Sequence, residues 1–233
     1  MTSESTFEPL QREELVLTGP RGVLRILALR PAGSEPLPTV LLLGDEGSTA
    51  QDSLEDVERL ARAGFAVFRP LLTETADRDA LGALGLVLDT LFRRPEVAAE
   101  RSAVLGFGRG GTLAFLLGCT RRLAAVVDVE GPVLYPELSS ARPIQPLELA
   151  LNLEGAFLAF FAAASGRVPA SEIELLRDRL SSAARPFDIV VHPRASEGFH
   201  DRRRPGFDAG CAEDLWRRVL SFLRSNLEED VSP

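Results

Sequence analysis

The chain has 233 residues, 45% of them hydrophobic and 26% charged, which is the balance of a globular protein long enough to bury a sizeable core. Its formal net charge of -8 argues against nucleic acid or an anionic membrane as the main partner. All 26 basic side chains are arginine, which excludes chemistry that needs a lysine, such as Schiff-base catalysis or a Walker phosphate loop.

The chain begins with a polar, acidic segment, MTSESTFEPLQREEL, which has neither the basic nor the apolar region of a secretory signal. No apolar run is long enough to span a membrane, so we expect a cytoplasmic protein. Residues 1–12 and 228–233 are expected to be flexible ends of one domain that spans 1–233.

Apolar runs that end in turn residues predict strands, and apolar residues at spacings of three and four predict helices. A Pro-rich stretch at 131–150 interrupts this rhythm and is expected to be a long loop, with a lid as one option. In chain order the elements are strands at 14–18, 23–30 and 39–45, a helix at 49–64, a strand at 65–70, a helix at 78–94, a strand at 101–108, a helix at 111–119, strands at 122–131 and 155–165, a helix at 170–183, a strand at 187–193 and a helix at 210–227.

This alternation of strands and helices predicts an α/β fold. Strands that are joined through helices run parallel, with the helices on both faces of the sheet. The first two strands are joined by the short turn GPRG and predict an antiparallel hairpin at the N-terminal edge. Two cysteines and two histidines offer no ligand spacing for a metal, and no metal or cofactor is expected.

The segment VLGFGRGG, residues 104–111, predicts a strand that turns sharply into a helix. The order G-x-S-x-G marks such a turn when it carries a hydrolase nucleophile. Here Gly106 and Gly110 flank the turn, and Gly108 stands at the nucleophile position with no side chain to attack a substrate. The backbone amide of Arg109 would point where an oxyanion hole needs a donor.

The same turn also matches a dinucleotide-binding loop. Gly106, Gly108 and Gly111 spell G-x-G-x-x-G, and Asp128 or Glu130 lies about twenty residues further on, where a ribose contact is needed. Such a loop normally follows the first strand of its domain, whereas two strand–helix units precede it here. We therefore rank dinucleotide binding third among the functions that the sequence allows.

The stretch VVHPRASEGFHDRRRPGFDAGCAEDLW resembles the corresponding part of the dienelactone hydrolase family of α/β hydrolases. In that family a Gly-Phe-His triplet after the last strand carries the catalytic histidine, and an Arg-Pro pair follows before the final helix. The triplet here ends at His200, and the pair is Arg204 and Pro205. The resemblance covers residues 14–226 and implies an α/β-hydrolase fold with a mainly parallel central sheet.

The resemblance also locates the remaining members of a catalytic triad, whose chain order is nucleophile, acid and histidine. The nucleophile position is Gly108, and the acid position falls at or near Ser165, ahead of a Val-Pro pair. No aspartate or glutamate occurs in 155–171, so the acid is missing as well. Of the three members only His200 matches, while Glu46 occupies the place of an acidic residue in the oxyanion-hole loop.

A hydrolytic triad needs a nucleophile, a base and an acid that orients the base. Without two of these, we expect a non-hydrolytic pseudoenzyme whose cleft binds a small ligand or whose surface binds a partner. The arginine run at 202–204 is expected to be a solvated loop, with Arg204 the residue best placed to anchor an anionic ligand at the cleft mouth.

An active enzyme remains open as the second reading. It would hydrolyse esters or lactones, or transfer protons, by using His200 with Asp45 or Glu46 and a non-standard nucleophile or water. The sequence does not indicate an oligomeric state.

Overall fold

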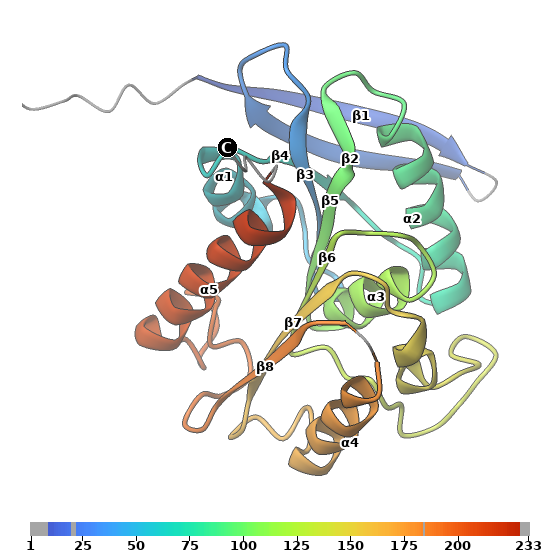
Figure 1. Ribbon diagram of the computed structural model, residues 1–233, viewed down its shortest axis with the longest axis vertical. Coiled ribbons are helices and arrows are strands. Elements are labelled where there is room, and N and C mark those ends of the chain that lie inside the picture. The colour runs from blue at the N-terminus through green and yellow to red at the C-terminus, as the bar shows by residue number, and fades with distance from the viewer. Residues whose placement is uncertain (1–8, 20–21, 184, 229–233) are drawn as a thin grey trace, which may run out of the picture.

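The computed structural model describes residues 9–19, 22–183 and 185–228. Its eight strands form one sheet in the order β1-β2-β4-β3-β5-β6-β7-β8 (Figure 1). β1 and β2 are antiparallel to each other, β2 is antiparallel to β4, and all other neighbours are parallel. The strands are β1 (Leu10–Gly19), β2 (Gly22–Pro31), β3 (Leu37–Leu43), β4 (Ala66–Pro70), β5 (Val97–Phe107), β6 (Ala125–Val129), β7 (Ala156–Ala162) and β8 (Phe187–His192).

Helices cover both faces of this sheet, which confirms the predicted α/β architecture (Figure 1). Apolar residues of α1 and α5 join the core cluster on one face, and those of α2, α3 and α4 join the cluster on the other. In the part of the chain that the structure describes, no helix is long and apolar enough to cross a membrane. The helices are α1 (Leu54–Arg62), α2 (Asp77–Leu91), α3 (Arg109–Gly118), α4 (Ala170–Ser181) and α5 (Ala209–Leu227), with 3-10 turns η1 (Gln51–Ser53) and η2 (Pro146–Asn152).

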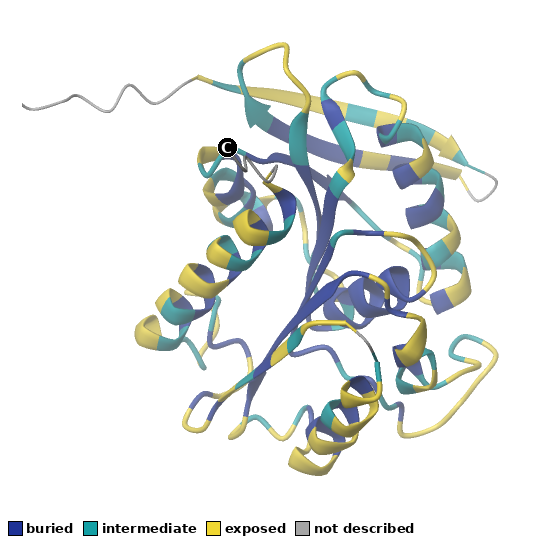
Figure 2. Ribbon diagram, viewed as in Figure 1, coloured by how far each residue is buried: buried dark blue, intermediate teal, exposed yellow. Residues whose placement is uncertain are grey.

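The central strands are apolar runs because helices bury both of their faces. Every residue of β6 and β7 is buried, as the dark blue centre of the sheet in Figure 2 shows. Along β3, Leu41 and Leu43 pack on one face, while Val40 and Leu42 pack on the other. This two-sided burial fixes the register of the strands and therefore the positions of the loops that follow them.

Several element boundaries differ from the predictions, and three of the differences are at the start of an element. β1 begins at Leu10, because Leu10 pairs with Pro31, so residues 10–12 belong to the edge strand and are not a flexible end. β5 begins at Val97, since Val97 and Ala98 pair with Leu37 and Pro38 of β3 ahead of a register shift. α3 begins directly at Arg109. The expectation of flexible ends at 1–8 and 229–233 falls outside the described residues.

The Pro-rich stretch 131–150 is tied down by side chains of the neighbouring helices. The buried carboxylate of Glu172, on α4, accepts hydrogen bonds from the amides of Val133 and Leu134 at 2.6 and 2.9 Å. The Tyr135 hydroxyl donates to the carboxylate of Asp77, on α2, at 2.6 Å. These bonds fix the stretch against α2 and α4.

We expect the substitution Glu172→Ala to lower the free energy of unfolding by about 1 to 3 kcal/mol, because it leaves buried amides without an acceptor. Glu174→Ala is the matched control, since Glu174 lies exposed on the same helix and its loss should change the free energy by less than about 0.5 kcal/mol. Urea unfolding of both variants measures the difference. Equal stabilities would show that Glu172 does not hold the loop.

Candidate functional site

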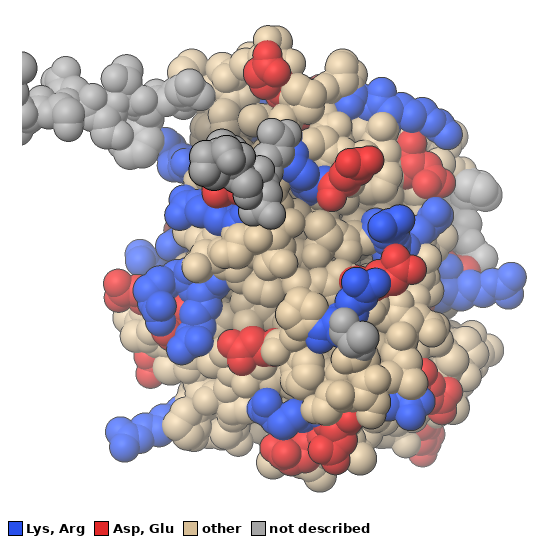
Figure 3. All heavy atoms as spheres, viewed as in Figure 1, with Lys and Arg blue, Asp and Glu red and all other residues tan. Residues whose placement is uncertain are grey.

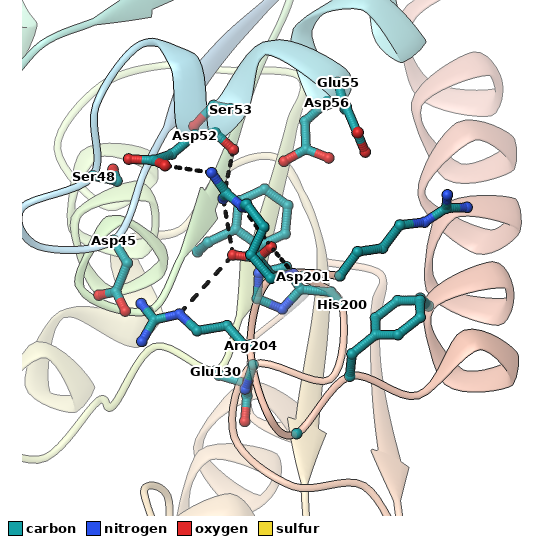
Figure 4. Close-up of a pocket in the computed structure, with 18 of the residues that line it drawn as sticks. Asp45, Ser48, Asp52, Ser53, Glu55, Asp56, Glu130, His200, Asp201 and Arg204 are labelled. Carbon is teal, nitrogen blue, oxygen red and sulfur yellow. Dashed lines mark hydrogen bonds and ion pairs between the residues drawn. The ribbon is translucent and has the colours of Figure 1, made fainter.

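An open cleft of about 1480 Å³ lies at the carboxyl ends of the parallel strands. The loops after β3, β5, β6, β7 and β8 supply its floor, and α1 and α5 supply walls (Figure 4). None of the residues 131–150 lines it, so this stretch is not a lid over the cleft. Ligands of open α/β sheets bind at this edge, which makes the cleft the candidate site.

The turn between β5 and α3 has the geometry of a nucleophile elbow. Gly108 has φ 54° and ψ -122°, a left-handed conformation that favours glycine. Its amide donates to the carbonyl of Val129 at 2.8 Å, which fixes the turn against the end of β6. The elbow is thus present, but its apex carries no side chain.

The carboxylate of Asp45 fills the space above this apex. Its Oδ1 accepts hydrogen bonds from the backbone amides of Arg109 and Glu46, both at 2.9 Å. One amide follows the elbow apex and the other lies in the loop after β3, which are the two donors of an α/β-hydrolase oxyanion hole. A Cβ atom at Gly108 would overlap the Asp45 carboxyl. Asp45 therefore occupies both the oxyanion hole and the space that a nucleophile would need.

Arg167, in the loop after β7, holds Asp45 in place. The guanidinium of Arg167 lies 3.2 and 3.3 Å from the two oxygens of Asp45, and 2.7 Å from Glu197. Ser165 shapes the loop, because its hydroxyl accepts from the amide of Arg167 at 3.1 Å and donates to the carbonyl of Ala162 at 2.9 Å. The loop in which the sequence predicted a triad acid position at Ser165 thus places a cation beside Asp45.

The pKa of Asp45 lies below its ordinary value. Burial acts to raise this pKa, but the hydrogen bond from the amide of Arg109, the charge of Arg167 and the hydrogen bond from the amide of Glu46 together outweigh burial. The side chain is consequently an anion at neutral pH. An oxyanion that develops on a substrate would have to displace it or face its charge.

His200 lines the cleft but has no acid to orient it. Its ring stacks on that of Phe107, with centroids 4.5 Å apart. Its Nδ1 is buried and has no hydrogen-bond partner among the described residues. Burial lowers the pKa of His200 to about 4, against the opposing charges of Asp201 and Asp45. The imidazole is therefore neutral at physiological pH, and neither tautomer is selected by a partner.

Glu130 is a further carboxyl of the cleft, which the sequence had suggested only as a ribose contact. It follows β6 with φ 59°, an unusual conformation for a residue other than glycine. It is 3% exposed; one oxygen accepts from the amide of Gly198 at 2.9 Å, and Oε1 has no partner in the described chain. Burial raises the pKa of Glu130 to about 7, although that amide opposes the shift.

Three residues suggested by the sequence contribute less than their side chains implied. Glu46 is exposed, and its amide rather than its carboxylate contacts the site. The guanidinium of Arg109 points away, with 2.9 Å to the carbonyl of Thr75 and 3.6 Å to Asp77. Arg204 is half exposed at the cleft mouth, 3.9 Å from Asp201.

The glycines of the G-x-G-x-x-G pattern have packing roles. A Cβ atom at Gly111 would overlap the carboxyl of Asp128, which is fully buried and accepts from the amide of Gly131 at 2.8 Å. The first amide of α3, which would have to receive a pyrophosphate, donates to Asp45 instead. This arrangement argues against the dinucleotide reading.

The described residues contain no group of three or more His, Cys, Asp and Glu side chains that could hold a metal ion. Figure 3 shows acidic and arginine side chains interspersed over the visible face. The lining of the cleft likewise contains both acidic side chains and arginines.

Comparison with known proteins agrees with this architecture. The model of the dienelactone hydrolase family matches residues 69–227. A protein of Methylorubrum extorquens named "Putative carboxymethylenebutenolidase" is 24% identical over 227 residues, which are 87% of this chain and 77% of that protein. An Escherichia coli protein of the same name is 27% identical over 217 residues, 84% of this chain and 80% of that one.

Solved structures share the fold. The crystal structure titled "Putative Dienelactone Hydrolase" from Klebsiella pneumoniae matches with a TM-score of 0.86 and 23% identity, over 93% of this chain and 99% of that one. The family model covers well over half of the chain, including the elbow, the loop after β7 and the His200 segment. The chain belongs to the dienelactone hydrolase family of α/β-hydrolase-fold proteins.

Proposed function

We propose that this protein is a non-hydrolytic member of its family, whose cleft binds a small ligand without cleaving it. One observation carries the proposal: the Asp45 carboxylate lies on the two amides that would stabilise a substrate oxyanion. The same carboxylate excludes a side chain at Gly108.

The missing groups affect separate steps of the family's chemistry. Without a side chain at Gly108 there is no covalent nucleophile, and the anionic Asp45 opposes an oxyanion in its hole. Loss of the orienting acid alone lowers kcat by about 10⁴-fold in serine proteases, and the Nδ1 of His200 has no such acid. Together these changes remove attack, charge stabilisation and base orientation.

The cleft nevertheless keeps the properties of a binding site. Its volume of about 1480 Å³ is not filled by Phe107 or by residues 131–150. Two of its lining residues carry a buried polar atom that has no partner among the described residues: the Oε1 of Glu130 and the Nδ1 of His200. Buried polar atoms without partners are costly, and a bound ligand that pairs with them removes that cost.

The direct test is the hydrolysis of activated esters and enol lactones by the purified protein and by His200→Ala. We expect both proteins to give the same rate, equal to the buffer background, because Gly108 has no side chain to attack a substrate and no described acid bonds to the Nδ1 of His200. Turnover that disappears in His200→Ala would contradict the proposal. It would favour instead an active hydrolase or acid–base catalyst that uses His200 with water or a non-standard nucleophile.

A double-mutant cycle tests whether Asp45 and the elbow apex exclude one another. We expect Gly108→Ala to destabilise the protein more strongly in the natural background than in an Asp45→Ala background, because only the former contains the overlapping carboxyl. The backbone strain that an alanine introduces at the apex is common to both backgrounds and cancels. The coupling should be about 1 to 3 kcal/mol by urea unfolding. Additive effects would show that Asp45 does not occupy the apex.

A further inference from the structure

The floor of the cleft carries more negative than positive charge. The guanidinium of Arg167 contacts two carboxylates of this region, Asp45 and Glu197. The charges of these three groups also affect a third carboxyl group, Glu130. Asp45 and Glu197 already pair with Arg167, whereas Glu130 has no ion pair in the described chain. The charge of one arginine is therefore shared among more carboxyls than it can neutralise.

The arginines of the cleft are engaged by other groups of the protein. Arg203 pairs with Asp52 and Asp201, and Arg204 lies near Asp201. The guanidinium of Arg59 lies 5.0 Å from the ring centroid of Trp216. The arginine run at 202–204 suggested an anionic ligand. Such a ligand would have to compete with carboxylates of the protein for these guanidinium groups.

The buried atoms that lack partners are suited to a hydrogen-bond donor. An ionised Glu130 presents Oε1 as an acceptor only. The Nδ1 of His200 is also an acceptor whenever the neutral imidazole carries its proton on Nε2. Because a protonated primary amine has several N–H donors and no acceptor, it complements such groups in both charge and hydrogen bonding.

We propose that the floor of this cleft binds the ammonium group of a small primary amine, with Glu130 as the carboxylate that receives it. The inference deepens the proposed function and rests on it, because it names the ligand class of the same cleft. The chemical class is an organic cation with an N–H-bearing head and a short apolar body. Phe107 and Trp216, whose ring centroids lie 6.2 Å apart, supply apolar surface in the cleft for that body.

Binding should strengthen as pH rises from 6 to 8. Burial raises the pKa of Glu130 to about 7, so its carboxyl is mostly protonated at the lower pH and mostly ionised at the higher. Of the charged groups around it, Asp45 has a lowered pKa and stays ionised, His200 has a pKa of about 4 and stays neutral, and Arg167 stays charged. The ionised fraction of Glu130 changes by about tenfold over this interval.

A second carboxyl of the cleft titrates in the same range and provides a matched control. Asp56, on the α1 wall, has its pKa raised to about 7 by burial, with the charge of Arg59 in opposition. The pH dependence assigned to Glu130 should therefore persist in Asp56→Asn and vanish in Glu130→Gln. If it followed Asp56 instead, the assignment to Glu130 would be wrong.

The experiment compares butylamine, butanol and butyrate, which contain four carbon atoms each and differ in the charge of the head. Isothermal titration calorimetry gives Kd at pH 6 and pH 8, and the fluorescence of Trp216, the chain's one tryptophan, reports occupancy of the cleft. We expect saturable butylamine binding at pH 8 that is at least about tenfold tighter than binding of butanol or butyrate.

Glu130→Gln should weaken butylamine binding by about tenfold or more, since a neutral amide replaces the anion. Glu154→Gln removes an exposed carboxyl outside the cleft and should leave the Kd unchanged. Circular dichroism and thermal melting confirm that each variant folds. Should Glu130→Gln not fold, Glu197→Gln removes the carboxylate that pairs with Arg167 and provides a second loss of negative charge, with weaker butylamine binding expected.

Butyrate binding in preference to butylamine, or no saturable butylamine binding, would overturn the amine inference. Neither result would contradict the proposed non-hydrolytic function, which is assayed separately on the same preparations with activated esters. Conversely, hydrolysis that depends on His200 would overturn the proposed function, while the calorimetric comparison would still report whether the floor prefers a cation.

Discussion

The Asp45 carboxylate joins three parts of the chain that lie far apart in sequence. It accepts hydrogen bonds from the amide of its neighbour Glu46 and from the amide of Arg109 at the start of α3. It also accepts two hydrogen bonds from the guanidinium of Arg167, which follows β7. The Asp45 side chain is 25% exposed, and hydrogen bonds with an opposite charge replace the hydration that it loses. Arg167 and the two amides supply these interactions. The two amides are the donors that would otherwise stabilise a reaction intermediate.

The residues at the three positions where the sequence predicts a triad are physically connected through Asp45. With Asp45 in the oxyanion hole, a side chain at position 108 would overlap its carboxyl, and Gly108 avoids that overlap. An acid in the loop after β7 would place like charge near Asp45, whereas Arg167 from that loop places opposite charge there. At the predicted histidine position, the ring of His200 is stacked on Phe107 and buried as a neutral group. Gly108 and Arg167 thus both favour the position that the Asp45 carboxylate occupies.

Most of the fold could be predicted from the sequence, because two-sided burial of β3, β6 and β7 leaves unmistakable apolar runs. The edge strand was less predictable: β1 begins with polar residues that pair along its backbone while facing solvent. For the site, the motif around His200 and the glycine elbow predicted residues that line the open cleft. Asp45 and Arg167 are 122 residues apart in the sequence, and no local sequence pattern predicts contact between residues at that separation. The burial of Glu130 likewise depends on tertiary packing.

The most direct measurement is an NMR titration of the backbone amides of Arg109 and Glu46 from neutral to acid pH. If both amides donate to Asp45, their proton shifts should follow one protonation, with a midpoint below the ordinary aspartate value of 3.8. Asp45→Asn should remove that transition from both. Amides that do not titrate together, or a midpoint above the ordinary value, would show that Asp45 does not occupy the oxyanion hole.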